Sequence, residues 1–144
     1  MESKYRSRLI GMLGFAMRAG RVTVGADLVC ASLKKIKERE SALAVLSCTA
    51  SDATKRRLGF KCEYYGVKLI EVDIDSGELG RILGKAYAPA VVLINDAGFA
   101  REIATAHDGY LNEARGHQST QRKEVSDEET GEPYAASSKN NSDN

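Results

Sequence analysis

Ala42-Leu43-Ala44-Val45-Leu46 is the stretch that decides the fold class, because a continuously apolar run of this length is typical of a strand covered on both faces. A second such run extends from Ala90 to Ile94, and Pro89 stands at its entry, where the missing N–H does no harm. Val22 to Val24 is a short β-branched run, and Lys68 to Val72 has the pattern of a further strand. The sequence therefore predicts four strands.

Helical patterns separate these strands. Apolar residues recur at helical spacing over residues 4–18, and Gly20 follows this segment as a stop signal. Further helices are expected from Gly25 to about Lys37, from about Thr54 to Tyr65, from Ser76 as the cap to Gly84, and from Asp96 to about His107. The alternating order αβαβαβαβα predicts an α/β layered sandwich around a central mixed, largely parallel sheet of about four strands.

Composition limits the domain number and the class of protein. The chain has 144 residues, of which 42% are hydrophobic and 28% charged, and we expect one domain over residues 1–110. After Ala114 the only sizeable apolar residues are Val125 and Tyr134, so residues 111–144 are expected to form a disordered polar tail. No apolar run approaches the roughly 18 residues that span a bilayer. We therefore expect a cytoplasmic protein without a membrane partner.

Motifs for catalysis or cofactor binding are missing from the sequence. It has no glycine-rich nucleotide fingerprint and no nucleophile elbow, and its three cysteines lack metal-ligand spacing. Cys48 follows a buried strand and is the best nucleophile candidate, with Lys55 or Arg56 as the cation that would favour its thiolate, although free cysteine is usually a small buried hydrophobe. We expect no enzyme, cofactor, metal or small-molecule substrate; a site near Cys48 and Asp52 is the least favoured alternative.

Basic residues are more informative. Lys55, Arg56 and Arg57 are expected in the first turn of a helix, where cations oppose the helix dipole. Helix N–H groups and three basic side chains together suit phosphate groups. The alternative is a solvated charge run that Glu63 or Asp52 partly compensates. The net charge of +1 permits a nucleic-acid partner and does not demand one.

A second candidate site opens the following helix pattern at Gly25-Ala26-Asp27. Two small residues leave a helix N-terminus unobstructed, so a ligand backbone can approach closely. The Asp27 carboxylate suits the N–H donors of a base edge, although it also stabilises a helix N-terminus electrostatically. Lys34 shares a helical face with Asp27 and adds positive charge.

Several segments, taken in order, resemble one family. They are Ala19–Val22, Gly25–Asp27, Cys62–Val67, Glu78–Gly84 and Asp96–Ala100. Together they look like the L7Ae/L30e ribosomal protein superfamily, which includes kink-turn RNA binders, and most of all like its bacterial YlxQ-like branch. The resemblance covers about residues 4–107. It implies a three-layer α/β/α sandwich that binds RNA without a cofactor and without catalysis.

The resemblance also implies how RNA would be read. Kink-turn binders of this family carry Gly-x-Asn-Glu-x-x-Lys, whereas this sequence keeps Gly25 and has Asp27, Leu28 and Ala31 at the Asn, Glu and Lys positions; Arg21 is the basic residue upstream. Each base-reading contact is worth roughly 1–3 kcal/mol, so tight reading of a standard kink-turn is not expected, while phosphate contacts remain.

The family's second RNA element is the loop before the last strand, here residues 85–89. Lys85 and Tyr87 are expected to close over an unstacked nucleotide, with the tyrosine stacked on a base. The alternative is a tyrosine packed on the sheet edge.

We therefore expect a non-catalytic protein that binds ribosomal or other structured RNA of the translation machinery, with ribosomal or translation proteins as further partners. The alternative is a protein-binding adaptor on the same fold that has lost specific kink-turn recognition. The expected RNA-binding residues are Arg21, Gly25, Ala26, Asp27, Lys34, Lys55, Arg56, Arg57, Lys85 and Tyr87.

Overall fold

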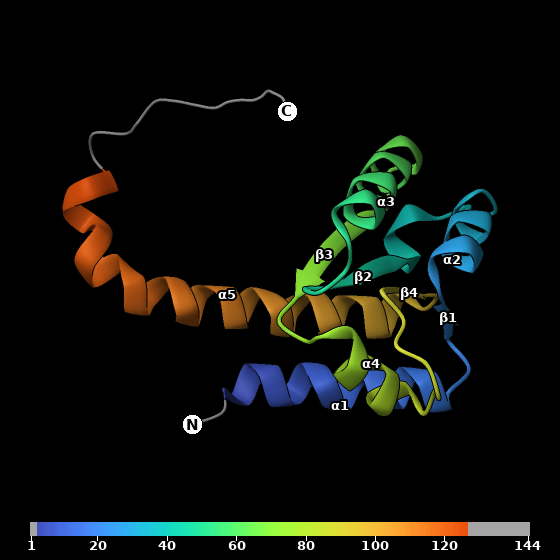
Figure 1. Cartoon of the computed structure of the whole chain (residues 1–144), viewed down its shortest axis with the longest axis horizontal. Coiled ribbons are helices and arrows are strands. Elements are labelled where there is room, and N and C mark those ends of the chain that lie inside the picture. Colours follow the sequence, from blue (N-terminus) through green and yellow to red (C-terminus); the bar gives the residue numbers. More distant parts are fainter. Residues whose placement is uncertain (1–2, 127–144) are drawn as a thin grey trace. The chain divides into compact units, whose positions relative to one another are not determined.

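The computed structural model describes residues 3–126, with side-chain surroundings up to Gly116. The elements are α1 (Lys4–Arg18), β1 (Val22–Val24), α2 (Ala26–Leu33), a 3-10 turn (Arg39–Ser41), β2 (Leu43–Ser47), α3 (Asp52–Tyr65), β3 (Lys68–Val72), α4 (Ser76–Leu83), β4 (Val91–Ile94) and α5 (Ala97–Ser126) (Figure 1). The chain divides into two compact units, Met1–Tyr110 and Leu111–Asn144. None of the helices in the described part is long and apolar enough to cross a membrane.

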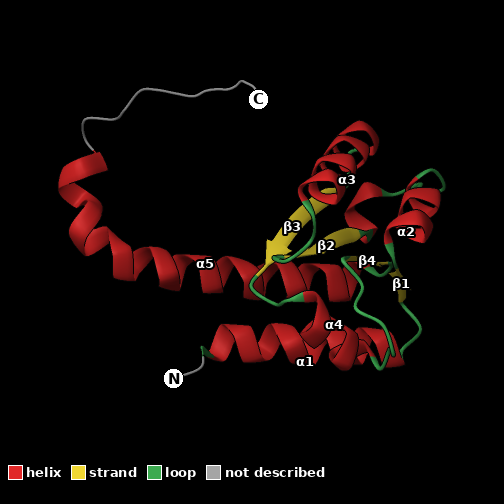
Figure 2. Cartoon of the chain, viewed as in Figure 1, coloured by secondary structure: helices red, strands yellow, loops and turns green. Residues whose placement is uncertain are grey.

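The four strands form one sheet in the order β1-β4-β2-β3 (Figure 2). The predicted mixed sheet is confirmed, but its expected largely parallel pairing is wrong: β2 pairs in parallel with β3, whereas β4 runs antiparallel to both β1 and β2. The 14-residue α3 returns the chain to the edge where β2 began, which makes β3 parallel to it. After β3 and the eight-residue α4, the chain instead enters β4 at Val91, which pairs with Leu46 near the end of β2.

Two hydrophobic cores lie on the two faces of the sheet, which confirms the three-layer sandwich. In β2 the side chains alternate: Leu43 and Val45 join a core with α1, α4 and α5, whereas Ala44 and Leu46 join a core with α2 and α3. β4 alternates in the same way and is fully buried. The continuously apolar runs that predicted these strands thus reflect helices on both faces (Figure 1).

The two ends of the strands define two edges of the sheet. At the edge where β2 and β3 end, the N–H of Gly25 donates a hydrogen bond to the carbonyl of Val91 at 3.0 Å; we name this the Gly25 edge. At the opposite edge Leu43 pairs with both Lys68 and Ile94; we name this the Leu43 edge.

Helix ends differ from the sequence predictions for local reasons. α2 ends at Leu33 rather than near Lys37, and the N–H groups of Lys35 and Ile36 bond instead three residues back, in turns. This early end leaves Ile36 packed against the core that contains α2 and α3. α3 begins at Asp52 because the Ser51 hydroxyl accepts the Thr54 N–H at 3.1 Å.

Two further boundaries were also mispredicted. Asp75, not Ser76, caps α4, because its carboxylate accepts the Glu78 N–H at 2.8 Å. α5 continues to Ser126 instead of ending near His107, so the start of the expected disordered tail is helical. Residues 111–126 contain no proline and many good helix formers, which explains a helix that the lack of apolar residues did not predict. Residues 127–144 of that tail lie outside the described residues.

Candidate nucleic-acid interface

The N-terminus of α2 is open. Gly25 is the N-cap residue, with φ +103°, and no described side chain caps this helix. In the other α-helices a side chain accepts a hydrogen bond from a backbone N–H of the first turn; these caps are Ser3, Ser51, Asp75 and Asp96. Ala26 is half-buried and Asp27 is exposed. The first-turn N–H groups of α2 therefore remain available to an anionic or polar ligand.

Replacing Gly25 with alanine tests the backbone at this N-terminus. A Cβ at Gly25 meets nothing within 4 Å, but a φ of +103° is a region that L-residues avoid. We expect Gly25→Ala to lower the free energy of unfolding by about 1–3 kcal/mol, measured by urea denaturation. Gly59→Ala in α3 is the control, since its Cβ also meets nothing within 4 Å. Equal stability of the two variants would contradict the positive φ of Gly25.

An ion pair joins the start of α2 to the basic run of α3. The Arg57 Nη2 atom lies 3.1 Å from the Asp27 Oδ1 atom, and the two side chains are 47% and 93% exposed. Such an exposed pair stabilises the fold by less than about 1 kcal/mol. Its consequence is positional: the guanidinium of α3 lies beside the open N-terminus of α2. Arg56 is exposed and forms no ion pair within the described part of the chain.

Lys55 points toward a different partner. Its Nζ atom lies 3.1 Å from the Glu71 Oε2 atom of β3, so its charge is partly compensated. Because α3 begins at Asp52, an acidic residue occupies the first turn, and Arg56 and Arg57 follow in the second. The prediction that these arginines lie in the first turn is therefore wrong. The acidic residues that pair with Lys55 and Arg57 are Glu71 and Asp27, not the expected Glu63 or Asp52.

The loop before β4 also lies at the Gly25 edge. Gly80 of α4 is buried, and a Cβ there would lie 2.3 Å from the carbonyl oxygen of Tyr87 and 3.3 Å from Pro89 Cδ. The loop backbone therefore packs directly on α4. Tyr87 itself is 56% exposed, rather than packed away on the sheet. Lys85 is half-buried, and its N–H donates to the Gly80 carbonyl at 2.8 Å.

Arg21 and Lys34 are not brought to the Gly25 edge. Arg21 precedes Val22, which pairs with Ile94 at the other end of β1. Lys34 is the C-cap residue of α2, a helix length away from Gly25. Both side chains are exposed, but neither is placed beside the Arg57–Asp27 pair.

The thiols show no catalytic arrangement. Cys48 is half-buried, and Lys55, one of its two expected cations, pairs with Glu71. Burial, together with the neighbouring Cys30, raises the pKa of the Cys62 thiol to about 11, so this thiol is protonated at neutral pH. Within the described residues, no three His, Cys, Asp or Glu side chains gather as a metal site.

Three large apolar side chains on α2 and α3 are exposed, and the two on α3 were not predicted from the sequence. Leu28 is 63% exposed, Phe60 68% and Tyr64 80%. Leu28 lies in α2, next to Asp27, and the two aromatic residues lie one turn apart on α3. The signal was available for α3: Leu58 and Cys62 mark its buried face, and Phe60 and Tyr64 alternate with them.

Comparisons with known proteins agree with this fold. Residues 8–104 match the model of the Ribosomal protein L7Ae/L30e/S12e/Gadd45 family. The RNA-binding protein YlxQ of Bacillus subtilis (strain 168) is 37% identical over 97 residues, which make up 67% of this chain and 92% of that protein. The RNA-binding protein YlxQ of Enterococcus faecium is 29% identical over 110 residues, 76% of this chain and 100% of that protein.

Solved structures show the same architecture. A protein with unknown function from Bacillus halodurans C superposes with a TM-score of 0.62 at 31% identity, covering 74% of this chain and 99% of that one. The 15.5kD RNA binding protein of Giardia lamblia, at 16% identity, gives a TM-score of 0.59 over 76% of this chain and 89% of that one, a likeness of fold alone. The family match and the bacterial relatives together show that the chain belongs to the L7Ae/L30e/S12e/Gadd45 family of ribosomal proteins.

Proposed function

We propose that this protein binds structured RNA of the ribosome or the translation machinery in the cytoplasm, without catalysis, through the Gly25 edge. The observation that carries the proposal is the uncapped N-terminus of α2 beside the Arg57–Asp27 pair. Backbone N–H groups and a guanidinium then lie near one another, which suits a phosphate group. The two YlxQ relatives, which are named RNA-binding proteins, support RNA as the ligand.

Phosphate contacts are proposed to dominate over base reading. Leu28 and Ala31, at the family's Glu and Lys positions, are exposed on α2 but carry no hydrogen-bonding side chain. Asp27 keeps a carboxylate at the Asn position, and Arg57 occupies one of its oxygens. A carboxylate accepts hydrogen bonds from base N–H groups and repels phosphate. Because Leu28 and Ala31 cannot form such bonds, Asp27 is the one side chain at these three positions that can read a base edge.

The loop of residues 85–89 would complete the interface. Tyr87 offers a ring that is more than half exposed, on a loop held against α4. Stacking of a base on such a ring contributes roughly 1–3 kcal/mol and tolerates any base. Arg21 and Lys34 are proposed to contribute to RNA affinity only by long-range electrostatic attraction, without direct contacts.

Mapping the bound RNA by NMR tests this function. In the ¹⁵N-labelled full chain, a ribosomal RNA fragment should shift the backbone amide signals of residues 25–28, 56–57 and 85–87 most, because RNA would touch those N–H groups or their neighbours. Shifts centred on residues 39–43 and 97–104 of the Leu43 edge would contradict the proposal.

One observation favours the second candidate function, a protein-binding adaptor. Leu28, Phe60 and Tyr64 expose large apolar surfaces on α2 and α3, and such residues are common in protein interfaces. RNA that leaves every amide signal unmoved at moderate salt would favour this function over the first.

A further inference from the structure

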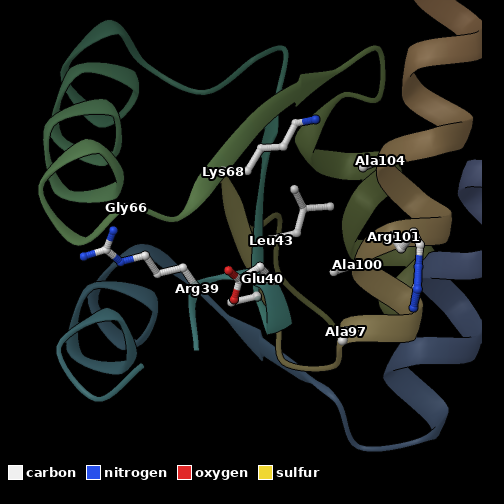
Figure 3. Close-up of a pocket in the computed structure, with 10 residues that line it drawn as sticks. Arg39, Glu40, Leu43, Gly66, Lys68, Ala97, Ala100, Arg101 and Ala104 are labelled. Atoms are coloured by element: carbon white, nitrogen blue, oxygen red, sulfur yellow. The ribbon is translucent and has the colours of Figure 1, made fainter. Parts of the chain in front are cut away.

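A cavity of about 630 Å³ lies at the Leu43 edge, at the other end of the strands from the proposed RNA-binding surface. Its apolar floor includes Leu43 and Ala100, and its polar lining is Arg39, Glu40, Lys68 and Arg101 (Figure 3). Small-molecule sites have roughly this size, about 300–1,000 Å³.

The cavity exists because three of the four α5 side chains that line it are small. Alanines at positions 97, 100 and 104 recur with helical spacing and line the hollow. Leu43 and Ala100 on the floor are almost fully buried, whereas Ala97 is exposed and Ala104 half-buried, so these last two alanines offer the hydrocarbon that a ligand can reach. An apolar, flat part of a ligand therefore finds contact on this side.

Three cations gather around the cavity, and no carboxylate of a described residue compensates them in an ion pair. Arg39, Lys68 and Arg101 form no ion pair with any described residue, so their charges are available to an anion. The three cations come from three elements, the 3-10 turn, β3 and α5, so they stand on different sides of the hollow (Figure 3).

The side chain of one of these cations, Arg39, packs against the backbone of Gly66. A Cβ at Gly66 would lie 2.7 Å from the Cδ atom of Arg39, so the Arg39 stem lies across this glycine at the rim. Glu40 supplies the single carboxylate in the lining, which leaves an excess of positive charge. An anionic ligand that also carries N–H donors matches this set of groups.

We propose that this cavity binds one phosphorylated nucleoside. The base would lie against Ala97 and Ala104, Glu40 would accept hydrogen bonds from base N–H groups, and Lys68 and Arg101 would hold the phosphate. A free nucleotide and the phosphorylated end of an RNA present the same chemistry. This site does not depend on RNA binding at the Gly25 edge.

Titration of the labelled full chain with AMP, CMP, GMP, UMP and inorganic phosphate tests the site. The nucleotides should shift the signals of Ala97 and Ala104 saturably, with dissociation constants of about 1 mM or tighter. The double variant Lys68→Glu/Arg101→Glu should bind at least about tenfold more weakly. Lys61→Glu/Arg81→Glu, which makes the same charge change on residues outside both sites, should bind as the unaltered chain does.

Glu40→Gln tests the base contact. It should weaken AMP, CMP and GMP, which carry amino groups, more than UMP. Inorganic phosphate binding as tightly as the nucleotides would overturn the assignment of a base to Ala97 and Ala104. No saturable shift, or shifts unchanged in Lys68→Glu/Arg101→Glu, would overturn the whole site. Competition by a short 5′-phosphorylated RNA, but not by its unphosphorylated form, would assign the site to RNA ends; no competition would assign it to free nucleotides.

Discussion

Changing Arg56 and Arg57 together to glutamate is expected to weaken binding of ribosomal RNA by at least about 100-fold. Two charge-assisted phosphate contacts, each worth roughly 1.5–3 kcal/mol, would be lost and replaced by repulsion. The fold should survive, since Arg56 is exposed without an ion pair in the described chain and the Arg57–Asp27 pair is exposed. Fluorescence anisotropy at one fixed salt concentration measures the loss.

A matched control separates position from net charge. Lys35→Glu/Lys37→Glu makes the same charge change on exposed residues just after α2, away from the Gly25 edge. We expect this control to weaken binding by less than about tenfold, through the general field alone. Equal losses in the two double variants would show that RNA responds to total charge, and that α3 is not the binding element.

The Gly80→Ala variant in α4 is expected to destabilise the fold by displacing the loop that carries Tyr87. The new Cβ would lie 2.3 Å from the Tyr87 carbonyl oxygen, a backbone atom that no rotamer change can move. Overpacking of this kind costs roughly 1–3 kcal/mol, partly offset by about 1 kcal/mol of improved helix propensity. RNA affinity should fall as well, because the loop must leave its position against α4.

Gly11→Ala is the control for this variant. Gly11 also lies within a helix, α1, but its Cβ would meet nothing within 4 Å. Thermal unfolding should show Gly11→Ala unchanged or up to about 1 kcal/mol more stable, and Gly80→Ala less stable. Equal melting temperatures would mean that the loop shifts freely and is not held by α4.

The strands and layers were predictable because they follow from local patterns. Continuous apolar runs such as Ala42–Leu46 predict a strand that is covered on both faces, and helices do lie on both faces of this sheet. The direction of β4 was not predictable in this way, since it depends on where the chain leaves the short α4. The end of α2 depends on tertiary packing of Ile36, which periodicity alone does not reveal.

The candidate site was only partly predictable for a related reason. Gly25 and the basic run of α3 stood out in the sequence, but their meeting through Asp27 and Arg57 joins residues 30 positions apart. Arg21 is near Gly25 in sequence, yet a strand separates them, so it lies at the other edge. No sequence motif marks the cavity at the Leu43 edge, because its lining residues are far apart in the sequence and come from a turn, two strands and a helix.

The central claim is that this protein holds RNA mainly by phosphate contacts at the Gly25 edge. The most direct test compares a kink-turn RNA with the same RNA after its sheared G·A pairs are replaced by Watson–Crick pairs, each titrated across a salt series. We predict affinities that fall steeply with salt and that differ by less than about tenfold between the two RNAs. A loss of more than about 100-fold on replacing the sheared pairs, with little dependence on salt, would contradict the claim.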